Sequence, residues 1–183
     1  MTERRREISR RAVELFADRG FHGVSVGDIG AACGISGPAI YKHFRGKDDV
    51  LAEALVDIST QLLETGRERA AAAGPDPSAR LDALVAWHID FAVEHPAYIV
   101  VQEREWATLD AAARDRVRTL QLAYVDVWVE EVRSLRDDLA RAEARAAVQA
   151  TFGLLNSTPH SARIGEAALR TLLARMARAA LLG

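Results

Sequence analysis

The sequence predicts an all-α protein with an N-terminal three-helix helix-turn-helix domain over residues 1–46 and a C-terminal helical domain over residues 47–183, about nine helices in all. Apolar residues recur at spacings of three and four along most of the 183 residues, which indicates amphipathic helices. No stretch shows the polar–apolar alternation of a strand. Two short helical stretches meet at a glycine turn near residue 34, and a Gly/Pro-rich break follows at residues 71–77.

The first helix is expected over residues 3–19. Its apolar residues share one face at helical spacing, and they are Ile8, Ala12, Val13, Leu15 and Phe16. Gly20 is expected to end it, since glycine takes the left-handed conformation at low cost. Three helices of this size bury only a small core, so we expect support from the helix that begins near Lys47.

Ser25 and Asp28 indicate the start of the second helix, because they stand three residues apart in the pattern of a capping box. They predict a helix over residues 26–33. Its inward face is expected to carry Ile29, Ala32 and Cys33. Gly34 then ends the helix, and Ile35 is expected to be buried in the turn.

The third helix is expected over residues 36–44, with Ser36 as its cap. Pro38 falls in its first turn, where a missing N–H costs little. Ile40 and Phe44 lie four residues apart and are expected to face inward. The outer face then carries Tyr41, Lys42 and His43.

A helix-turn-helix consists of two short helices at a fixed angle, and its second helix fits the major groove. This motif is typical of proteins that bind double-stranded DNA. Basic residues near the motif support this function, and they are Arg4, Arg5, Arg6, Lys42 and Lys47. The alternative is a small helical hairpin with no role in nucleic-acid binding.

The stretch from Ala12 to Leu55 resembles the TetR family of transcriptional regulators. The residues that match the family pattern are Ala12, Leu15, Phe16, Gly20, Phe21, Ser25, Val26, Ile29, Gly34, Ile35, Ser36, Ile40, Tyr41, His43, Phe44, Lys47, Asp48 and Leu51. The sequence departs from the pattern at Gly30, where alanine is usual and glycine weakens a helix by about 1 kcal/mol. It also departs at Gly27, where an arginine is frequent, and at Gly37-Pro38.

The resemblance implies that the third helix enters the major groove of DNA. The residues nearest the base edges are then Ser36, Gly37, Pro38 and Ala39, none of which is a long hydrogen-bond donor. The residues expected at phosphates are Ser25, Tyr41, Lys42, His43 and Lys47. Packing alone is the alternative for Tyr41, and a capping or core role is the alternative for His43. The Arg4–Arg6 run either contacts DNA or forms a solvated end.

Charge is divided unevenly along the chain. Residues 1–50 hold nine Lys/Arg and seven Asp/Glu, whereas the remainder holds fifteen and nineteen. A mildly basic head on an acidic body favours local contact with DNA over general coating. The single cysteine, Cys33, is expected to be a buried and inert thiol. Without an apolar span or signal region, the protein is expected in the cytoplasm, with no membrane partner.

Six further helices are expected beyond the motif. They run over residues 47–70, 78–95, 98–109, 110–135, 139–155 and 164–182, with a loop over residues 156–162. The last two are rich in alanine, and small residues let helices approach closely. The resemblance implies that this pair forms a homodimer with its mate, and the alternative is an ordinary packing face within one chain.

The C-terminal domain also offers a candidate effector site. Its members are mostly aromatic side chains with a few polar groups among them, as is typical of small-molecule sites. They are Trp87, His88, Phe91, Tyr98, Gln102, Trp106, Tyr124, Trp128, Phe152 and Asn156. An ordinary helical core is the alternative. We expect no cofactor and no metal, since the spacing of His88 and His95 is a weak signal. The C-terminal half is similar to family members that regulate lipid and steroid catabolism, some of which respond to acyl-CoA.

The expected function is therefore that of a ligand-responsive DNA-binding regulator. We expect a homodimeric repressor that leaves a palindromic operator when a small effector binds. The effector classes considered are acyl-CoA and other lipid-like molecules. An enzyme is not expected, because the sequence has no Gly-rich phosphate loop, metal-ligand spacing or nucleophile with a partner. The competing hypothesis is a dimeric sensing or interaction module whose N-terminal domain does not bind DNA.

Overall fold

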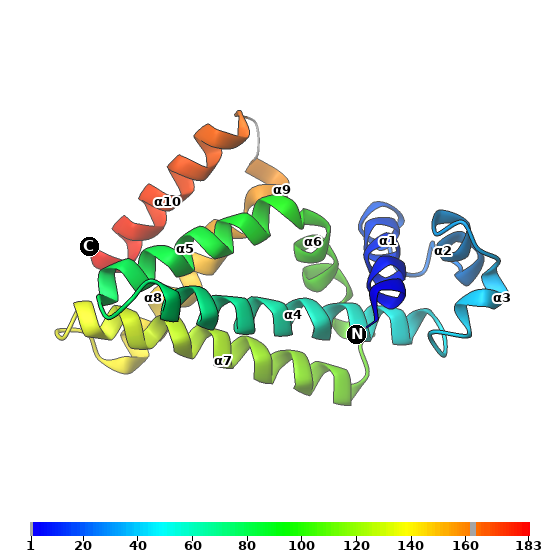
Figure 1. Cartoon of the computed structure of the whole chain (residues 1–183), viewed down its shortest axis with the longest axis horizontal. Helices are drawn as coiled ribbons and strands as arrows, with labels where there is room; N and C mark the ends of the chain where they lie inside the picture. The colour runs from blue at the N-terminus through cyan, green and yellow to red at the C-terminus, as the bar shows by residue number, and fades with distance from the viewer. Residues whose placement is uncertain (1, 162–163) are drawn as a thin grey trace. The chain divides into compact units, whose positions relative to one another are not determined.

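The structure is a computed structural model that describes residues 2–161 and 164–183. Within these ranges every regular element is helical (Figure 1). The elements are α1 Glu3–Arg19, α2 Val26–Ala32, α3 Gly37–Ile40, α4 Lys47–Ala72, α5 Pro77–Glu94, α6 Pro96–Glu105, a 3₁₀ helix η1 Trp106–Thr108, α7 Ala111–Leu135, α8 Arg141–Leu155, α9 Thr158–Ser161 and α10 Glu166–Leu182. Among these described helices, none is long and apolar enough to cross a bilayer. The all-α fold class is confirmed.

Most helices lie within a few residues of their expected positions, and one expected loop is different. The stretch 156–162 contains the one-turn helix α9, whose Thr158 hydroxyl donates to the backbone oxygen of Ala92 over 2.7 Å. This buried bond fixes a turn that the sequence pattern does not announce. Ala162, the last residue of the expected loop, lies outside the described residues.

Helix α1 buries the apolar stripe expected from its spacing. Ile8, Ala12 and Phe16 are fully buried, whereas Leu15 is half-buried. The Thr2 hydroxyl caps the first turn by accepting from the backbone N–H of Arg5. Gly20 ends the helix with φ of 75°, the left-handed conformation expected for this glycine.

Helix α2 begins with the expected capping box. The backbone N–H of Asp28 donates to Ser25 Oγ over 3.1 Å, and the backbone N–H of Ser25 donates to Asp28 Oδ2 over 2.8 Å. Gly34 has φ of 66°, as its position after the helix predicts. The expectation that Ala32 faces inward is wrong: Ala32 is exposed, because Ile29 and the neighbouring Gly30 form the buried side of the helix.

Helix α3 is shorter than the expected 36–44 helix. It spans four residues, and Tyr41 and Lys42 then continue in a tighter turn, with N–H groups that donate to the oxygens of Pro38 (3.3 Å) and Ala39 (3.2 Å). Ser36 occupies the N-cap position as expected, although its side chain makes no capping hydrogen bond. Ile40 and Phe44 are buried as predicted.

Close approach between α2 and α3 explains the unusual glycines of this motif. A Cβ on Gly30 would lie 2.9 Å from the backbone nitrogen of Gly37 and 2.9 Å from the backbone oxygen of Ile35. Both atoms belong to backbone and cannot swing away. Gly30 is therefore required by the packing of α2 on the following turn, a benefit that outweighs its lower helix propensity.

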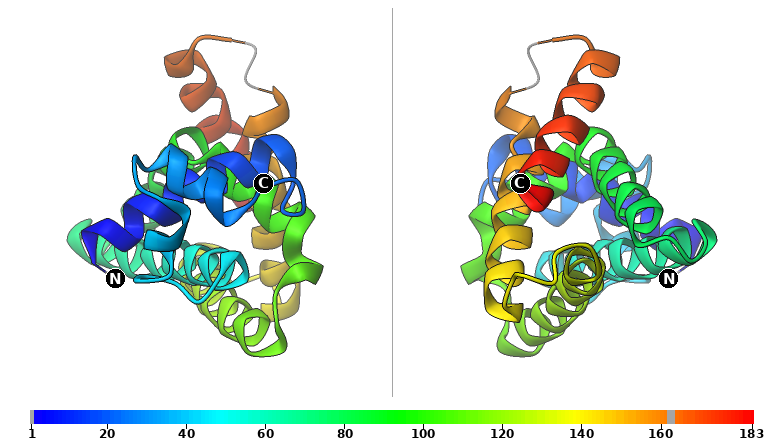
Figure 2. Two further views of the ribbon diagram at one scale, coloured as in Figure 1. Left: turned by 90° about the vertical axis from the view of Figure 1, so that its right-hand side faces the viewer. Right: turned by 90° about the vertical axis from the view of Figure 1, so that its left-hand side faces the viewer.

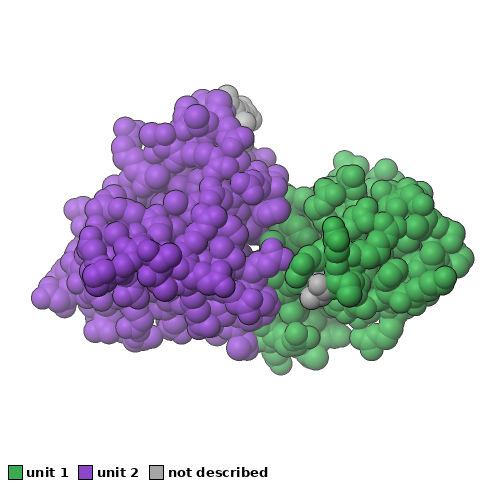
Figure 3. All heavy atoms as spheres, in the orientation of Figure 1, with its two compact units in different colours: residues 1–59, 97–118 green, residues 60–96, 119–183 purple. Residues whose placement is uncertain are grey.

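The chain forms two compact units, coloured in Figure 3. Unit 1 contains residues 1–59 and 97–118, and unit 2 contains residues 60–96 and 119–183. Each unit has its own apolar core. The long helices α4 and α7 contribute residues to both units, so packing does not divide the chain between residues 46 and 47. That boundary remains a prediction about function.

Unit 1 includes residues 97–118 because α6 is bonded to the end of α1. The buried carboxylate of Glu105 accepts from the backbone N–H of Phe21 over 3.1 Å. The neighbouring Arg104 donates to the backbone oxygens of Phe16 and, over 2.9 Å, Ala17. The Arg104 bonds add a donor to carbonyls in the last turn of α1, and the Glu105 bond pairs the backbone N–H that follows the helix.

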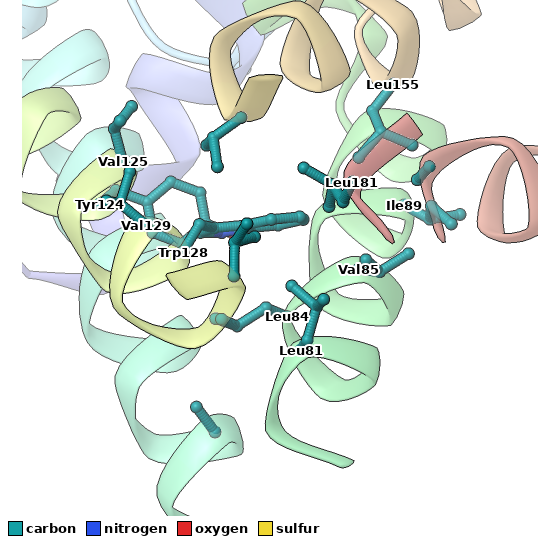
Figure 4. Packing of buried hydrophobic residues seen from close by; sticks show 14 of the residues in the cluster. Leu81, Leu84, Val85, Ile89, Tyr124, Val125, Trp128, Val129, Leu155 and Leu181 are labelled. Atoms are coloured by element: carbon teal, nitrogen blue, oxygen red, sulfur yellow. The ribbon is translucent and has the colours of Figure 1, made fainter. Parts of the chain in front are cut away.

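Unit 2 is built on α5, α8 and α10, which pack on one another, and its apolar core also includes side chains from the second half of α7 (Figures 1 and 2). Figure 4 shows the Trp128 side chain extending from α7 into this core, toward Leu181 of α10. Trp128 is fully buried and is the largest side chain of this core. Met176 of α10 is 43% exposed. Helix α10 instead buries Leu169, Leu173, Ala177 and Leu181.

We predict that Gly30→Ala destabilises the protein by about 1–3 kcal/mol, because the added methyl group overpacks a backbone contact. Gly27→Ala on the same helix is the matched control, since a Cβ there meets only the Ser25 hydroxyl at 3.5 Å. The control should be neutral or more stable by up to about 1 kcal/mol. Urea denaturation followed by circular dichroism measures both, and equal effects would contradict the packing role of Gly30.

Candidate nucleic-acid interface and internal aromatic cluster

The third helix and its following turn expose the side chains that were expected to touch DNA. Tyr41 is 60% exposed, although large aromatic residues are usually buried. Ser25, Ser36, Pro38 and Lys42 are also exposed, and Gly37, Ala39 and His43 are half-buried. The exposure of Tyr41 argues against the alternative that it only packs in the core.

Lys42 is the free cation of this surface. It is exposed, and within residues 2–161 and 164–183 no hydrogen bond or ion pair engages its ammonium group. The nearby Arg45 guanidinium instead pairs with Asp49 over 3.0 Å, and these hydrogen bonds raise the pKa of Arg45. Lys42 can therefore approach a phosphate without first breaking a bond within the protein.

Lys47 has an internal role that the sequence did not predict. Its ammonium donates to the backbone oxygens of Phe21 (2.9 Å) and Val24 (3.0 Å) and lies 4.4 Å from the centre of the Phe21 ring. Two of its three donors thus tie the start of α4 to the connection between α1 and α2. A phosphate contact by Lys47 would have only the remaining donor.

The Arg4–Arg6 run is neither a free arm nor a solvated end. Arg5 pairs with Glu53 and donates to the backbone oxygen of His43, and its guanidinium lies 4.4 Å from the Phe44 ring centre. Arg4 pairs with Glu7 and donates to the backbone of Cys33, and Arg6 lies 3.9 Å from Asp57. Arg5 therefore holds the end of the turn that follows α3 in place.

Seven of the ten residues of the expected effector site lie in unit 2, and three do not. Tyr98, Gln102 and Trp106 belong to unit 1, where Tyr98 and Trp106 pack against its core. Burial raises the pKa of Tyr98 to about 12. The structure does not gather these three with the other residues in one compact unit.

Five of the seven unit 2 residues form an aromatic cluster, which consists of His88, Phe91, Tyr124, Trp128 and Phe152. His88 has ring contacts with all four other members. The Phe152 ring lies 4.5 Å from His88, 5.4 Å from Tyr124 and 5.0 Å from Trp128, measured between ring centroids. His88 and Tyr124 stack almost parallel at 5.8 Å. Asn156 adds a hydrogen bond to His88 over 3.0 Å.

Trp87 lies at the margin of the unit 2 core. Its indole N–H donates to the backbone oxygen of Leu62 over 3.1 Å, and the Arg69 guanidinium lies 4.8 Å from its ring centre. The polar atom of Trp87 is thus satisfied within the protein. This places Trp87 apart from the members of the aromatic cluster.

Three polar atoms of the aromatic cluster are buried and unpaired. Among the described residues, His88 Nδ1, the Tyr124 hydroxyl and Trp128 Nε1 have no hydrogen-bond partner. Burial lowers the pKa of His88 to about 4 and raises that of Tyr124 well above its ordinary value. Both groups are therefore uncharged at neutral pH. Buried polar atoms are usually paired, so three together mark a candidate binding site.

Unit 1 contains an open cleft that shares no residue with the aromatic cluster. It has a volume of about 510 Å³ and is lined by Arg45, Gly46, Asp48, Asp49, Ala52, Glu53, Val56, Asp110, Ala112, Ala113 and Arg116. Its carboxylates are partly neutralised by arginines, as in the Arg45–Asp49 pair. None of the expected effector residues lines this cleft.

The supporting residues of both sites were missed by sequence reasoning. Arg5 contacts the backbone of a residue 38 positions away, and Glu105 contacts one 84 positions away. Gly66 of α4 lies so close to Tyr124 that a Cβ there would meet the ring at 2.7 Å. A local pattern carries no signal for such partners, because they come together only in the folded chain.

We predict that His88 makes the protein less stable in mild acid. Its pKa is about 4 when folded and about 6.5 in the unfolded chain, so the unfolded chain binds a proton between these values. Stability therefore falls as pH drops from 6.5 to 4, by about 2 kcal/mol between pH 6.5 and 5. Denaturant unfolding at pH 7 and pH 5 should show this loss, and His88→Gln should lack it. An identical pH dependence in both proteins would count against the buried neutral histidine.

Both parts of the chain match models of one protein family. Residues 8–54 match the family model described as bacterial regulatory proteins, tetR family, and residues 74–160 match the model described as tetracyclin repressor-like, C-terminal domain. FasR, a transcriptional activator of Mycolicibacterium smegmatis, is 29% identical over 88% of this chain and 71% of its own. KstR2, a transcriptional repressor of Rhodococcus jostii, is 35% identical over 55% of this chain and 49% of its own.

The fold is likewise shared with solved structures. AibR, determined in complex with isovaleryl coenzyme A and operator DNA, superposes with a TM-score of 0.76 at 23% identity, covering 95% of this chain and 97% of its own. At this identity the likeness shows the fold. Two family models that together cover more than half of the residues, and relatives that share both parts, lead to one conclusion: the chain belongs to the TetR family of bacterial regulatory proteins.

Proposed function

We propose that this protein is a homodimeric transcriptional regulator that binds a palindromic operator and is released from it by a small-molecule effector. The observation that carries the proposal is the exposed surface formed by α3 and its turn, where Tyr41 and the unpaired Lys42 stand on a tightly packed motif. A regulator of this kind acts on the chromosome, and so in the cytoplasm.

The interface residues fall into two groups by chemistry. Ser36, Gly37, Pro38 and Ala39 precede the turn and offer small side chains and backbone groups to base edges and thymine methyls. Ser25, Tyr41, Lys42 and His43 offer hydroxyl, ammonium and imidazole groups to phosphates. Lys47 belongs to the second group with one donor, because its other contacts are internal.

A homodimer through α8 and α10 gives the operator two recognition surfaces. The two helices pack on each other, and their outer faces expose small residues, which are Ala142, Ala146, Ala150, Gly153, Ala168 and Ala179. Met176 adds an exposed apolar side chain on α10. One short recognition helix gives limited affinity, whereas two half-sites separated by one turn of DNA, about 34–36 Å, supply the rest.

The sign of regulation and the effector are supported by the relatives' own descriptions. KstR2 is named a repressor and FasR an activator, and we favour repression because an operator-bound dimer blocks a promoter without further contacts. AibR was solved with isovaleryl coenzyme A. An acyl-CoA or other lipid-like effector suits the apolar aromatic cluster of this chain.

Helix α4 is the element through which an effector would act on DNA binding. It is continuous from Lys47, which holds the connection between α1 and α2, to Gly66, which touches Tyr124 of the aromatic cluster. A ligand that moves the Tyr124 ring therefore pushes directly on α4. A coupling of about 1–3 kcal/mol between two sites lowers operator affinity about 5–150-fold.

The second candidate is a dimeric sensing module that does not bind DNA. Gly27 removes a frequent phosphate contact, and Lys47 is engaged internally, which leaves few cations on the surface. The exposed Tyr41 favours DNA binding over this alternative, since an unused aromatic side chain in water gains nothing. Band shifts on the DNA upstream of the protein's own gene separate the two functions.

Lys42→Ala is expected to weaken binding to all DNA sequences alike, because an ammonium–phosphate contact carries no sequence information. The slope of log affinity against log salt should fall by about two per dimer, or about one per Lys42. Fluorescence anisotropy at several salt concentrations measures the slope. Arg67→Ala, which removes another exposed cation on α4, is the control and should leave it unchanged. An unaltered slope in Lys42→Ala would exclude the phosphate contact.

Met176→Glu is expected to convert the dimer to a monomer, because it places a charge in the apolar centre of the proposed α8–α10 interface. Leu122→Glu on α7 is a matched control, since Leu122 and Met176 are each 43% exposed. Light scattering after size-exclusion chromatography gives the mass. If both variants remain dimers, or the unchanged protein is a monomer, the proposed interface is wrong.

A further inference from the structure

The aromatic cluster carries a specific set of unfilled hydrogen-bond positions. Trp128 Nε1 is a donor only, and the Tyr124 hydroxyl both donates and accepts. Both side chains are buried, Trp128 at 0% and Tyr124 at 3% exposure, and neither polar atom has a partner among the described residues. They lie on successive turns of α7, with rings 6.1 Å apart.

His88 adds an acceptor to these two donors. The Asn156 Oδ1 atom, 3.0 Å from His88 Nε2, can only accept, so Nε2 carries the ring proton and Nδ1 presents a lone pair. The cluster as a whole thus offers two donors and one acceptor. All three belong to uncharged groups in an apolar setting.

The absence of charge restricts what can occupy this place. The pKa of His88 is set by burial and by Asn156. That of Tyr124 is raised by burial and lowered to a smaller extent by the nearby Trp128 N–H, although the two polar atoms do not meet the geometry of a hydrogen bond. No charged neighbour is among the causes for either group. A carboxylate or phosphate brought here would lose its hydration without gaining a cation, which is costly. An uncharged carbonyl oxygen has two lone pairs and suits two neighbouring donors.

The Phe152 ring now fills the space between these groups. It is only half-buried, in contrast to His88, Tyr124 and Trp128, and it comes from α8. A flat apolar group that displaces Phe152 would meet the same ring faces. Its entry would also press on Tyr124 and hence on Gly66 of α4.

We propose that the part of the effector that enters the aromatic cluster is an uncharged carbonyl group, as in a ketone, ester or thioester, on an apolar body, and that its carbonyl oxygen accepts hydrogen bonds from Tyr124 and Trp128 in place of the Phe152 ring. The inference rests on the proposed function, because it assigns the chemistry of the same effector site. It excludes the corresponding free carboxylate as the species that binds.

Three probes of one shape test this chemistry on the full-length protein: 2-acetylnaphthalene, 2-naphthoate and 2-ethylnaphthalene. They share the ring system and differ in carrying a ketone, a carboxylate or no polar group. Calorimetric titration at pH 7.5 should give saturable binding of the ketone, at least tenfold tighter than that of the carboxylate. Equal affinities for the two, or no saturable binding of the ketone, overturn the proposal.

Tyr124→Phe assigns the polar contact to its residue. It should weaken binding of 2-acetylnaphthalene about three- to tenfold, the worth of one hydrogen bond, and leave 2-ethylnaphthalene unchanged. Trp87→Phe is the matched control, because the Trp87 N–H is already bonded to Leu62, and it should leave all affinities unchanged. A Tyr124→Phe variant that binds the ketone as well as the unchanged protein overturns the assignment.

Stability provides a second readout that needs no ligand. Tyr124→Phe removes a buried unpaired hydroxyl, so its melting temperature should equal or exceed that of the unchanged protein. A lower melting temperature shows that the hydroxyl is paired and contradicts the proposal. These titrations contain no DNA. A selective ketone site in a protein that fails to bind any operator would refute the proposed function and leave the site assignment intact.

Discussion

A polar atom that leaves water on folding must find a hydrogen-bond partner, and this constraint distinguishes the two units of the protein. In unit 1, charged side chains form hydrogen bonds with backbone groups of distant residues. Lys47 and Glu105 hold the connection between α1 and α2, and Arg5 holds the end of the turn that follows α3. Apart from the Ser9 hydroxyl, the unpaired buried side-chain atoms of the described residues lie in unit 2. Unit 1 is thus held together by paired polar groups, whereas unit 2 keeps several buried polar atoms without partners among the described residues.

Glycine allows a close approach at two places in the fold, between backbone segments at Gly30 and between a ring and a helix at Gly66. Gly30 allows the backbones of α2 and the following turn to approach closely. Gly66 allows the Tyr124 ring of the aromatic cluster to lie against α4. In both cases a methyl group would be too large. Because α4 begins at the Lys47 tie and passes Gly66, one continuous helix connects the two features.

Several features of the fold followed from local sequence alone. The capping box of Ser25, the left-handed Gly20 and Gly34 and the buried stripe of α1 were predicted correctly, since each depends on neighbours within one helical turn. Other expectations failed where distant partners intervened. Ala32 is exposed because of what α2 packs against, and α9 forms in an expected loop because Thr158 bonds to Ala92, 66 residues away. The DNA-binding residues and the dimer interface stay predictions.

The sequence by itself determined that the chain is helical, where its helices begin and end, and that a helix-turn-helix lies near its start, because period, caps and glycines act over a few residues. Only the tertiary structure decided which polar groups are paired and which are not. It gave Lys47, Arg4 and Arg5 partners within the protein, and it assigned Tyr98, Gln102 and Trp106 to unit 1 and the other expected effector residues to unit 2. It also left polar atoms of His88, Tyr124 and Trp128 without partners among the described residues. The physical reason is that hydrogen bonding and burial depend on contacts between residues far apart in the chain, which no local pattern encodes.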